Sequence, residues 1–185
     1  IPQFEIIKEC VDAFQIPQIE IEGFEADDII ATYCKLAEKQ KIDSIIVSSD
    51  KDLMQLVTEK ITMLDPMKNK KIGIDQVVEK FGLPPEKVIQ IQALTGDKVD
   101  NIPGAPGIGP KTALQLIQEF GDVHKLIENV NKIPQEKRRN IIINHEEDIL
   151  VSLELVKLKD DINLPTGINK IHTYSSINKN DNLSK

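Results

Sequence analysis

Hydrophobic spacing in the first eighty residues changes repeatedly between helical and strand-like. Apolar side chains recur at helical intervals over residues 2–14 and 25–40, so both segments are predicted to be helices. Ile19 and Ile21 alternate with glutamates, as in a short strand. The remaining predicted elements are strands over 44–48 and 61–64, a short helix over 52–57 and a turn over 68–71. This alternation favours an α/β fold with a parallel-type sheet and flanking helices, in which the β-branched run at 44–48 is buried on both faces.

The second half of the chain has helical spacing throughout. Helices are predicted over residues 75–81, 85–95, 111–120, 123–129 and 135–155. A stretch rich in glycine and proline interrupts them before residue 111, and Asn, Ser, Lys and Gly dominate from about residue 163. We therefore expect an α/β part over residues 1–80, a helical part over 81–160, and a linker or tail over 161–185.

Composition argues against two classes of protein. No apolar run approaches the ~18 residues of a membrane-spanning helix, so no membrane partner is expected. Cys10 and Cys34 are too few for the disulfide framework of a secreted scaffold, and both are expected to be buried apolar residues. Because no secretory segment is recognisable, we expect a cytoplasmic protein. The sequence does not indicate an oligomeric state.

Acidic residues are concentrated in three short motifs. The net charge of the chain is −7, which is unfavourable for a simple electrostatic DNA binder. Without the motif carboxylates, however, the remaining acids equal the 23 basic residues in number. Nucleic acid is therefore compatible with the charge of this chain if the motif carboxylates hold cations. The motif carboxylates are Glu25, Asp27, Asp28, Asp50, Asp52, Asp97 and Asp100.

Each acidic motif taken alone also has a purely structural interpretation. The acids of residues 25–28 open a predicted helix, where they complement its dipole. Asp52 is suited to cap the short helix that it precedes. Asp97 and Asp100 flank a turn, a position that aspartate favours.

Taken together, the three motifs favour a metal centre. Asp50 and Asp52 follow a predicted parallel strand, and ligands bind outside the carboxyl ends of such strands. Several carboxylates at one edge are unfavourable unless cations neutralise them, and carboxylate oxygens suit Mg²⁺ or Mn²⁺. Two such ions would stabilise the attacking and leaving oxygens of phosphoryl transfer. The histidines are scattered and offer no competing metal site.

A glycine-rich loop precedes the predicted helix at 111–120. Its backbone N–H groups, the helix N-terminus and Lys111 would form an anion site. Two phosphate motifs fail here, because Pro110 separates the last glycine from Lys111-Thr112, and because no strand precedes the loop. We expect a hairpin between helices that contacts a phosphate backbone independently of sequence, in preference to a merely structural tight turn. The expected contact residues are Gly104, Gly107, Ile108, Gly109, Lys111 and Thr112.

The three acidic motifs and the glycine loop together resemble the 5′ nuclease domain of bacterial DNA polymerase I, which is related to phage 5′ nucleases and flap endonucleases. The shared motifs are Glu25-Ala26-Asp27-Asp28, Ser49-Asp50-Lys51-Asp52 and the long stretch over residues 96–113, and the match runs over about residues 1–160. The last motif is highly specific, whereas the two shorter ones are weak singly.

The resemblance implies a metal-dependent 5′→3′ exonuclease and structure-specific flap endonuclease of DNA replication and repair. It implies metal ligands at the seven motif carboxylates, and we expect Asp27, Asp28, Asp50 and Asp52 to be the catalytic ones. Around residues 104–112 it implies a helix–three-turn–helix element that grips duplex DNA, often with a bound K⁺. The implied partner is DNA with a 5′ end or flap, and a covalently linked polymerase domain is a further expectation.

One departure from that family concerns the beginning of the chain. The family's domain starts with a strand bearing a catalytic aspartate, followed by a second aspartate and a helical arch, and nothing in residues 1–24 matches those parts. We expect the sequence to be a fragment that begins after them and that is weak or inactive as a nuclease by itself.

Two other functions are left open by the sequence. A non-catalytic duplex-DNA-binding module would keep the glycine loop and treat the acids as remnants. A nucleotide-binding α/β protein ranks last, because both phosphate fingerprints fail.

Overall fold

The computed structural model describes residues 3–171 and contains one three-stranded sheet in that range. The strands are β1 (Ser44–Val47), β2 (Ile61–Asp65) and β3 (Lys70–Ile72), in the order β1-β2-β3. β1 and β2 are parallel and β2 and β3 are antiparallel. The parallel pair agrees with the predicted α/β fold, whereas β3 occupies part of the predicted turn. Asp65 ends β2 and its carboxylate accepts the N–H groups of Met67 and Lys68, which closes the turn one step earlier than predicted.

Four helical elements belong to the α/β part. They are α1 (Gln3–Ala13), α2 (Ala26–Lys39), the 3₁₀ helix η1 (Asp52–Leu56) and α3 (Ile74–Phe81). The predicted strand at Ile19–Ile21 is wrong, because none of the strands within residues 3–171 pairs with it, and the segment is irregular.

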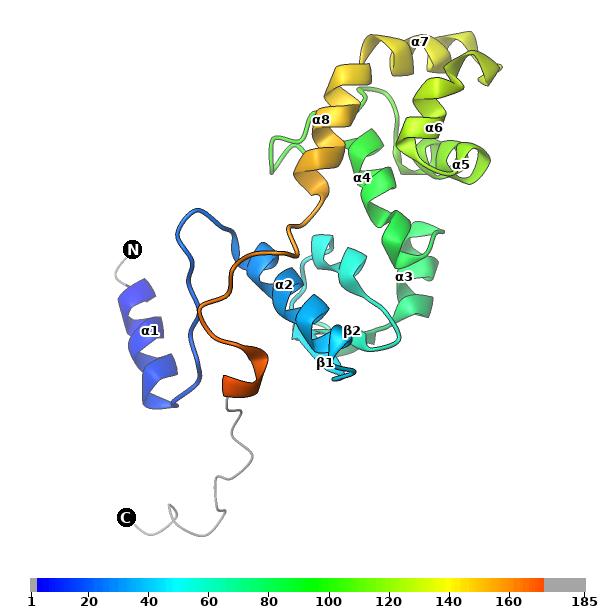
Figure 1. The fold of residues 1–185 in the computed structure, drawn as a ribbon. Coiled ribbons are helices and arrows are strands. Elements are labelled where there is room, and N and C mark those ends of the chain that lie inside the picture. Colours follow the sequence, from blue (N-terminus) through cyan, green and yellow to red (C-terminus); the bar gives the residue numbers. More distant parts are fainter. Residues whose placement is uncertain (1–2, 172–185) are drawn as a thin grey trace, which may run out of the picture.

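The burial predicted for β1 is also wrong. Ile46 is 5% exposed under α2, but Ile45 and Val47 on the opposite face are 65% and 63% exposed. They border an open apolar groove of about 670 Å³. Figure 1 shows α1 set apart from the sheet, and α1 has no buried residue. Cys10 on α1 is therefore exposed, contrary to prediction, while Cys34 on α2 is buried as expected.

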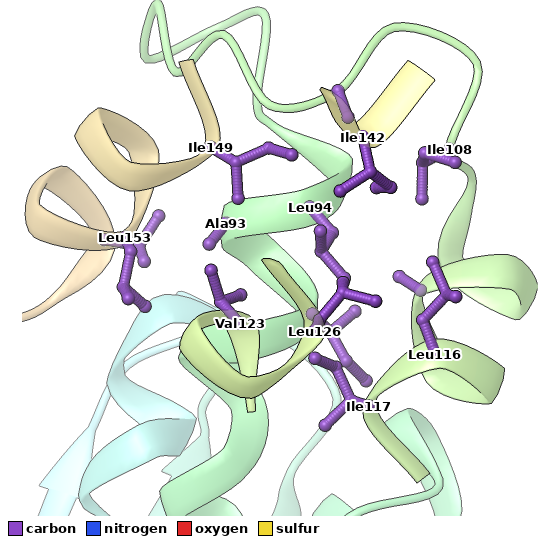
Figure 2. Packing of buried hydrophobic residues seen from close by; sticks show 14 of the residues in the cluster. Ala93, Leu94, Ile108, Leu116, Ile117, Val123, Leu126, Ile142, Ile149 and Leu153 are labelled. Atoms are coloured by element: carbon purple, nitrogen blue, oxygen red, sulfur yellow. The ribbon is translucent and has the colours of Figure 1, made fainter. Parts of the chain in front are cut away.

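The second half of the chain is a helical region with its own core. Its elements are η2 (Pro85–Lys87), α4 (Val88–Thr95), α5 (Pro110–Phe120), α6 (Val123–Glu128), η3 (Val130–Lys132), α7 (Glu136–Asn144) and α8 (Glu146–Val156). α4 is central, and Leu94 on it packs with Leu116 of α5 and Leu126 of α6 (Figure 2). These side chains are almost completely excluded from solvent, so the helical region buries its apolar surface by itself.

The single helix predicted over residues 135–155 is two helices. His145 leaves helical geometry, with φ −119° and ψ 24°, and its ring Nδ1 lies 2.8 Å from a carboxylate oxygen of Asp148. α8 then starts with Glu146, Glu147 and Asp148, which favour a helix N-terminus. Three successive acids were the sequence signal for this second start.

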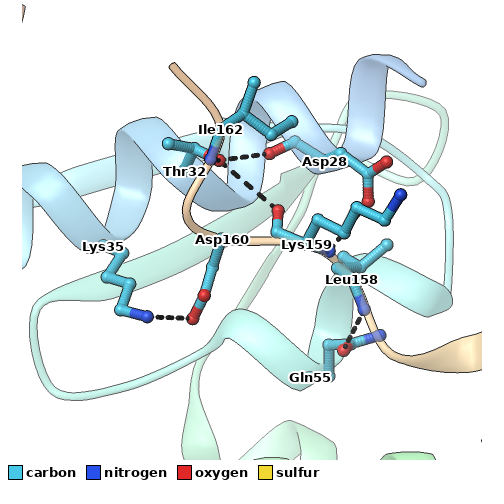
Figure 3. Close-up of polar contacts among 8 residues, drawn as sticks. All are labelled: Asp28, Thr32, Lys35, Gln55, Leu158, Lys159, Asp160 and Ile162. Carbon is cyan, nitrogen blue, oxygen red and sulfur yellow. Dashed lines mark hydrogen bonds and ion pairs between the residues drawn. The ribbon is translucent and has the colours of Figure 1, made fainter. Parts of the chain in front are cut away.

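A return segment, residues 157–171, connects the end of α8 back to the α/β part. Figure 1 shows it running from α8 past α2, and Figure 3 shows the crossing in detail. The backbone N–H of Ile162 donates to Oγ1 of Thr32 at 3.3 Å, and Lys35 pairs with Asp160 at 2.6 Å. Gln55 accepts the N–H of Leu158 at 3.3 Å and so joins this segment to η1. The two regions are therefore tied together at both α2 and η1.

Within residues 3–171, no helix has the length and apolar character needed to cross a membrane.

Candidate metal centre and nucleic-acid interface

The first acidic motif lies at the N-terminus of α2. Glu25 is the N-cap residue, and Asp27 and Asp28 occupy the first turn, where carboxylates interact favourably with the helix dipole. A carboxylate oxygen of Asp28 accepts the backbone N–H of Lys159 at 2.9 Å, which anchors it to the return segment (Figure 3). Asp28 therefore has a structural partner, whereas Asp27 beside it is half-buried without a hydrogen bond or ion pair among the described residues.

The second motif follows the carboxyl end of β1. The N–H of Asp50 donates to Oγ of Ser48 at 3.0 Å, and Oδ1 of Asp50 accepts the N–H of Asp52 at 2.9 Å. These two bonds shape the turn from the strand into η1. Asp52 is thus fixed at the start of η1, and its carboxylate accepts a hydrogen bond from Nε2 of Gln92 on α4.

The third motif is the turn after α4. Asp97 and Ile102 exchange two backbone hydrogen bonds of 2.9 and 2.8 Å, and the carboxylate of Asp97 accepts the N–H of Val99 at 2.8 Å. The side chain of Lys51, from the second motif, forms an ion pair with Asp97. The hydrogen bonds from Lys51 and Val99 hold the pKa of the Asp97 carboxyl below its ordinary value.

Electrostatic interactions show that the three motifs come together at one edge of the sheet. Burial, followed by the charges of Asp50 and Asp52, raises the pKa of Asp27 to about 6. Burial and the charge of Asp50 also raise the pKa of Asp52, and the charge of Asp100 contributes in the same direction. The first motif therefore acts on the second, and the second motif lies close to the third, to which the ion pair between Lys51 and Asp97 joins it.

A cavity of about 260 Å³ lies between the second and third motifs. It is lined by Lys51, Asp52, Lys80, Gln92 and Asp97, among other residues. Lys80 has no carboxylate partner among the described residues, and burial lowers the pKa of its ammonium group. The cavity therefore combines acidic oxygens with the ammonium group of Lys80, which donates to Sδ of Met54 at 3.6 Å.

The donor chemistry at this edge fits a hard divalent cation. All the candidate ligands are carboxylates, and the charges that act on Asp27 come from Asp50, Asp52, Glu25 and Asp28. Within residues 3–171, however, no group of three acidic, histidine or cysteine side chains is arranged so that it could hold a metal ion. Mg²⁺ keeps several waters and binds few carboxylates directly, so it needs fewer protein ligands than such a group supplies.

The glycine loop lies between α4 and α5. Gly104 has φ +58°, and a Cβ there would lie 2.4 Å from the backbone nitrogen of Gly96, so only glycine fits. The N–H of Gly104 donates to Oγ of Ser152 at 2.9 Å, and Ile108 is buried. These two residues shape the loop from inside.

The remaining predicted contact residues lie at the surface of the loop and the start of α5. Gly107, Gly109 and Lys111 are exposed and Thr112 is half-buried. The backbone N–H groups of Gly107 and Gly109 have no acceptor within the described part of the chain. The exposed half of the loop therefore presents amide donors and one lysine to solvent, as an anion site requires.

Sequence reasoning missed Gln92 and Lys80. Gln92 occupies a buried position of α4, a helix of largely apolar composition, and a polar residue at such a position was the signal that could have identified it. Lys80 carried no comparable signal, because the C-terminal turn of a helix is an ordinary place for lysine.

Two protein-family models match this chain and divide it between them. Residues 1–82 match the 5′-3′ exonuclease N-terminal resolvase-like domain, and residues 83–180 match the 5′-3′ exonuclease C-terminal SAM fold.

Relatives are similar over most of this chain. A DNA polymerase I of Rhizobium leguminosarum is 54% identical over 171 residues, which are 92% of this chain and 17% of that protein. A 5′-3′ exonuclease of Aquifex aeolicus is 38% identical over 162 residues, which are 88% of this chain and 55% of that protein. The chain thus spans only part of the length of either relative.

Solved structures with the same fold include bacteriophage T5 flap endonuclease in a pseudo-enzyme-product complex with DNA and metal ions. It superposes with a TM-score of 0.77 at 28% identity, covering 84% of this chain and 58% of the other.

Proposed function

The chain belongs to the 5′-3′ exonuclease family, and on that premise we propose that it forms part of a metal-dependent 5′ nuclease that hydrolyses phosphodiester bonds of DNA with a 5′ end or flap. The observation that carries the proposal is the convergence of three acidic motifs, distant in sequence, at one edge of the sheet. The T5 flap endonuclease complex, which contains DNA and metal ions, supports the same assignment.

In this proposal the seven motif carboxylates hold Mg²⁺ or Mn²⁺, with two ions as the preferred number. When bound, such ions lower the pKa of a water nucleophile and offset charge on the phosphate. Asp27, Asp50 and Asp52 are the proposed principal ligands, because the charges of Asp50 and Asp52 act on Asp27 and the charge of Asp50 acts on Asp52. Asp28 contributes charge from its anchored position, and Asp97 and Asp100 close the site from the helical side.

The glycine loop is the proposed contact with duplex DNA. The exposed amides of Gly107 and Gly109, together with Lys111, would hold the phosphate backbone without reading sequence. Gly104 and Ile108 support the loop from within, Thr112 lies in the first turn of α5, and K⁺ is a proposed occupant of the loop. Contacts here would set the position of the duplex relative to the acidic edge.

The division into parts over residues 1–80, 81–160 and 161–185 is also proposed, and its last fourteen residues lie outside the described range. The helical part would carry the DNA-binding loop and the α/β part the carboxylates. A linked polymerase domain, as in the DNA polymerase I relatives, and a cytoplasmic location complete the proposal.

The central test is Asp50→Asn in the full-length enzyme, assayed with a 5′-flap DNA and Mg²⁺. We expect hydrolysis to fall by roughly 100-fold or more, because a cation-holding oxygen is lost, while affinity for the same DNA is unchanged. Equal losses of rate and affinity would contradict this division of labour. Saturable DNA binding without any divalent-cation site would instead support a non-catalytic DNA-binding module.

The glycine loop is tested by Lys111→Ala. Affinity for duplex DNA is expected to fall uniformly across sequences, and the salt dependence of binding is expected to decrease by about one counterion. Lys39→Ala is the matched control, because Lys39 is also exposed but lies in the last turn of α2. Equal effects of the two substitutions would remove the loop from the interface.

A further inference from the structure

Gln92 is an unusual residue for its position. It lies on α4 among Val88, Ile91 and Leu94, and it is 9% exposed. Its Nε2 donates to Oδ1 of Asp52, and its Oε1 is buried with no hydrogen-bond partner among the described residues. A buried acceptor without a donor lowers the stability of the folded state, so an apolar side chain at this position would make the fold more stable.

The orientation of the Gln92 amide follows from the chemistry of its partner. The ionised carboxylate of Asp52 only accepts hydrogen bonds, so the NH₂ group must face it and the oxygen must point away. Both Gln92 and Asp52 line the cavity between the second and third acidic motifs. The amide nitrogen that holds Asp52 therefore lies at the acidic site.

Gln92 also connects the two regions that supply the acids. Its backbone carbonyl accepts the N–H of Gly96 at 2.8 Å, which ends α4 directly before Asp97. The same helical turn thus holds Asp52 through the Gln92 side chain and leads into Asp97, which pairs with Lys51. The spacing between the second and third motifs depends on this one turn.

We propose that Gln92 is a positioning residue of the divalent-cation site, which fixes the Asp52 carboxylate through Nε2. The inference rests on the metal site proposed above. Residues that orient metal-binding carboxylates without touching the metal commonly change metal affinity by 10–100-fold when they are replaced. An orientation role explains why a polar side chain with an unsatisfied oxygen occupies a core position.

The test is the affinity of the protein for Mn²⁺, measured by direct titration without DNA, in the protein and in Gln92→Leu. Leucine fills a similar volume, removes the donor to Asp52 and removes the buried oxygen. We expect about 10-fold weaker Mn²⁺ binding with an unchanged or higher melting temperature. Equal Mn²⁺ affinity, or a loss of affinity accompanied by a lower melting temperature, would overturn the positioning role.

Gln90→Leu is the matched control on the same helix. Oε1 of Gln90 accepts the N–H of Val123 at 2.8 Å, away from the acidic site. This substitution is expected to lower the melting temperature and to leave Mn²⁺ affinity unchanged. A loss of Mn²⁺ affinity in Gln90→Leu equal to that in Gln92→Leu would assign both effects to helix stability and overturn the proposal.

A second variant, Gln92→Glu, separates hydrogen-bond donation from charge. Glutamate cannot donate to Asp52 at pH 8, so Mn²⁺ affinity is expected to stay below that of the unaltered protein. Restored or tighter binding would mean that any acidic or polar group suffices, which overturns the inference. If the unaltered protein binds no Mn²⁺, the metal centre itself fails; if it binds and Gln92→Leu binds equally, only the inference about Gln92 fails.

Discussion

The helical region and the acidic edge of the α/β region satisfy opposite physical requirements. In the helical region, Leu94, Leu116 and Leu126 are buried against one another, and the chain supplies every partner that this core needs. At the acidic edge, burial and neighbouring charge raise the pKa values of Asp27 and Asp52, so the chain assembles negative charge that it does not neutralise. The helical core therefore stabilises the fold without any ligand, whereas the acidic edge keeps an electrostatic cost that a bound cation would remove.

The substitution with the greatest predicted effect removes a side chain from the core of the helical region. Leu116→Ala leaves a cavity in the helical core and is expected to lower the free energy of unfolding by about 2–5 kcal/mol. Urea denaturation followed by circular dichroism measures this change. The control is Leu155→Ala on α8, where the side chain is 58% exposed and a change below about 1 kcal/mol is expected. Similar losses for both would mean that the helical core is not the main source of stability.

A smaller effect concerns the connection between the two regions. Thr32→Val keeps the shape of the side chain but leaves the buried N–H of Ile162 without its acceptor, at an expected cost of about 2 kcal/mol. The loss should appear as faster hydrogen exchange in the return segment, with little change in the helical core. Uniformly faster exchange throughout the chain would show instead that the two regions unfold as one unit.

The third and weakest effect on stability concerns the raised pKa of Asp27 at the acidic edge. Folding raises the pKa of Asp27 from the ordinary 3.8 to about 6, so the folded state favours the protonated carboxyl. The stability gained in this way is complete below about pH 4 and is lost as the pH rises through 6. Asp27→Asn is therefore expected to stabilise the protein at pH 8 without divalent cations by about 1 kcal/mol, a value reduced for solvent screening.

Urea denaturation across this pH range measures the difference between Asp27→Asn and the unaltered protein. The difference in the free energy of unfolding is expected to disappear below pH 4. At pH 8, added Mn²⁺ is expected to raise the stability of the unaltered protein much more than that of Asp27→Asn. A difference that is independent of pH would show that Asp27 carries no unfavourable charge in the folded state.

Sequence patterns predicted most helices and the parallel strand pair because these depend on local spacing. Helical periodicity placed α2 and α5 within one or two residues of their observed ends. Errors arose where a tertiary neighbour decides. Ile19 and Ile21 alternate like a strand but pair with none of the described strands. β1 suits a buried strand but is covered on one face only, so Ile45 and Val47 are exposed. Periodicity describes a segment and does not specify what packs against it.

For the candidate site, the sequence predicted the acidic residues that come together, but not the hydrogen bonds and ion pairs that hold them. The three acidic motifs do act on one another, as the placement of Asp50 after a parallel strand suggested. The sequence did not predict that Lys51 would pair with Asp97 or that the return segment would bind Asp28, since both contacts depend on long-range packing. Whether these carboxylates bind metal and whether the exposed loop residues bind DNA stay predictions.

The crossing of the return segment over α2 has a consequence for folding kinetics. The hydrogen bond between Lys159 and Asp28 joins residues 131 positions apart, and the bond between Ile162 and Thr32 spans 130. Closing so long a loop costs chain entropy before any contact compensates it, whereas most contacts of the helical core join residues nearer in sequence. We therefore expect the helical core to form before this closure, and the hydrogen bond that holds the carboxylate of Asp28 to be among the last to form.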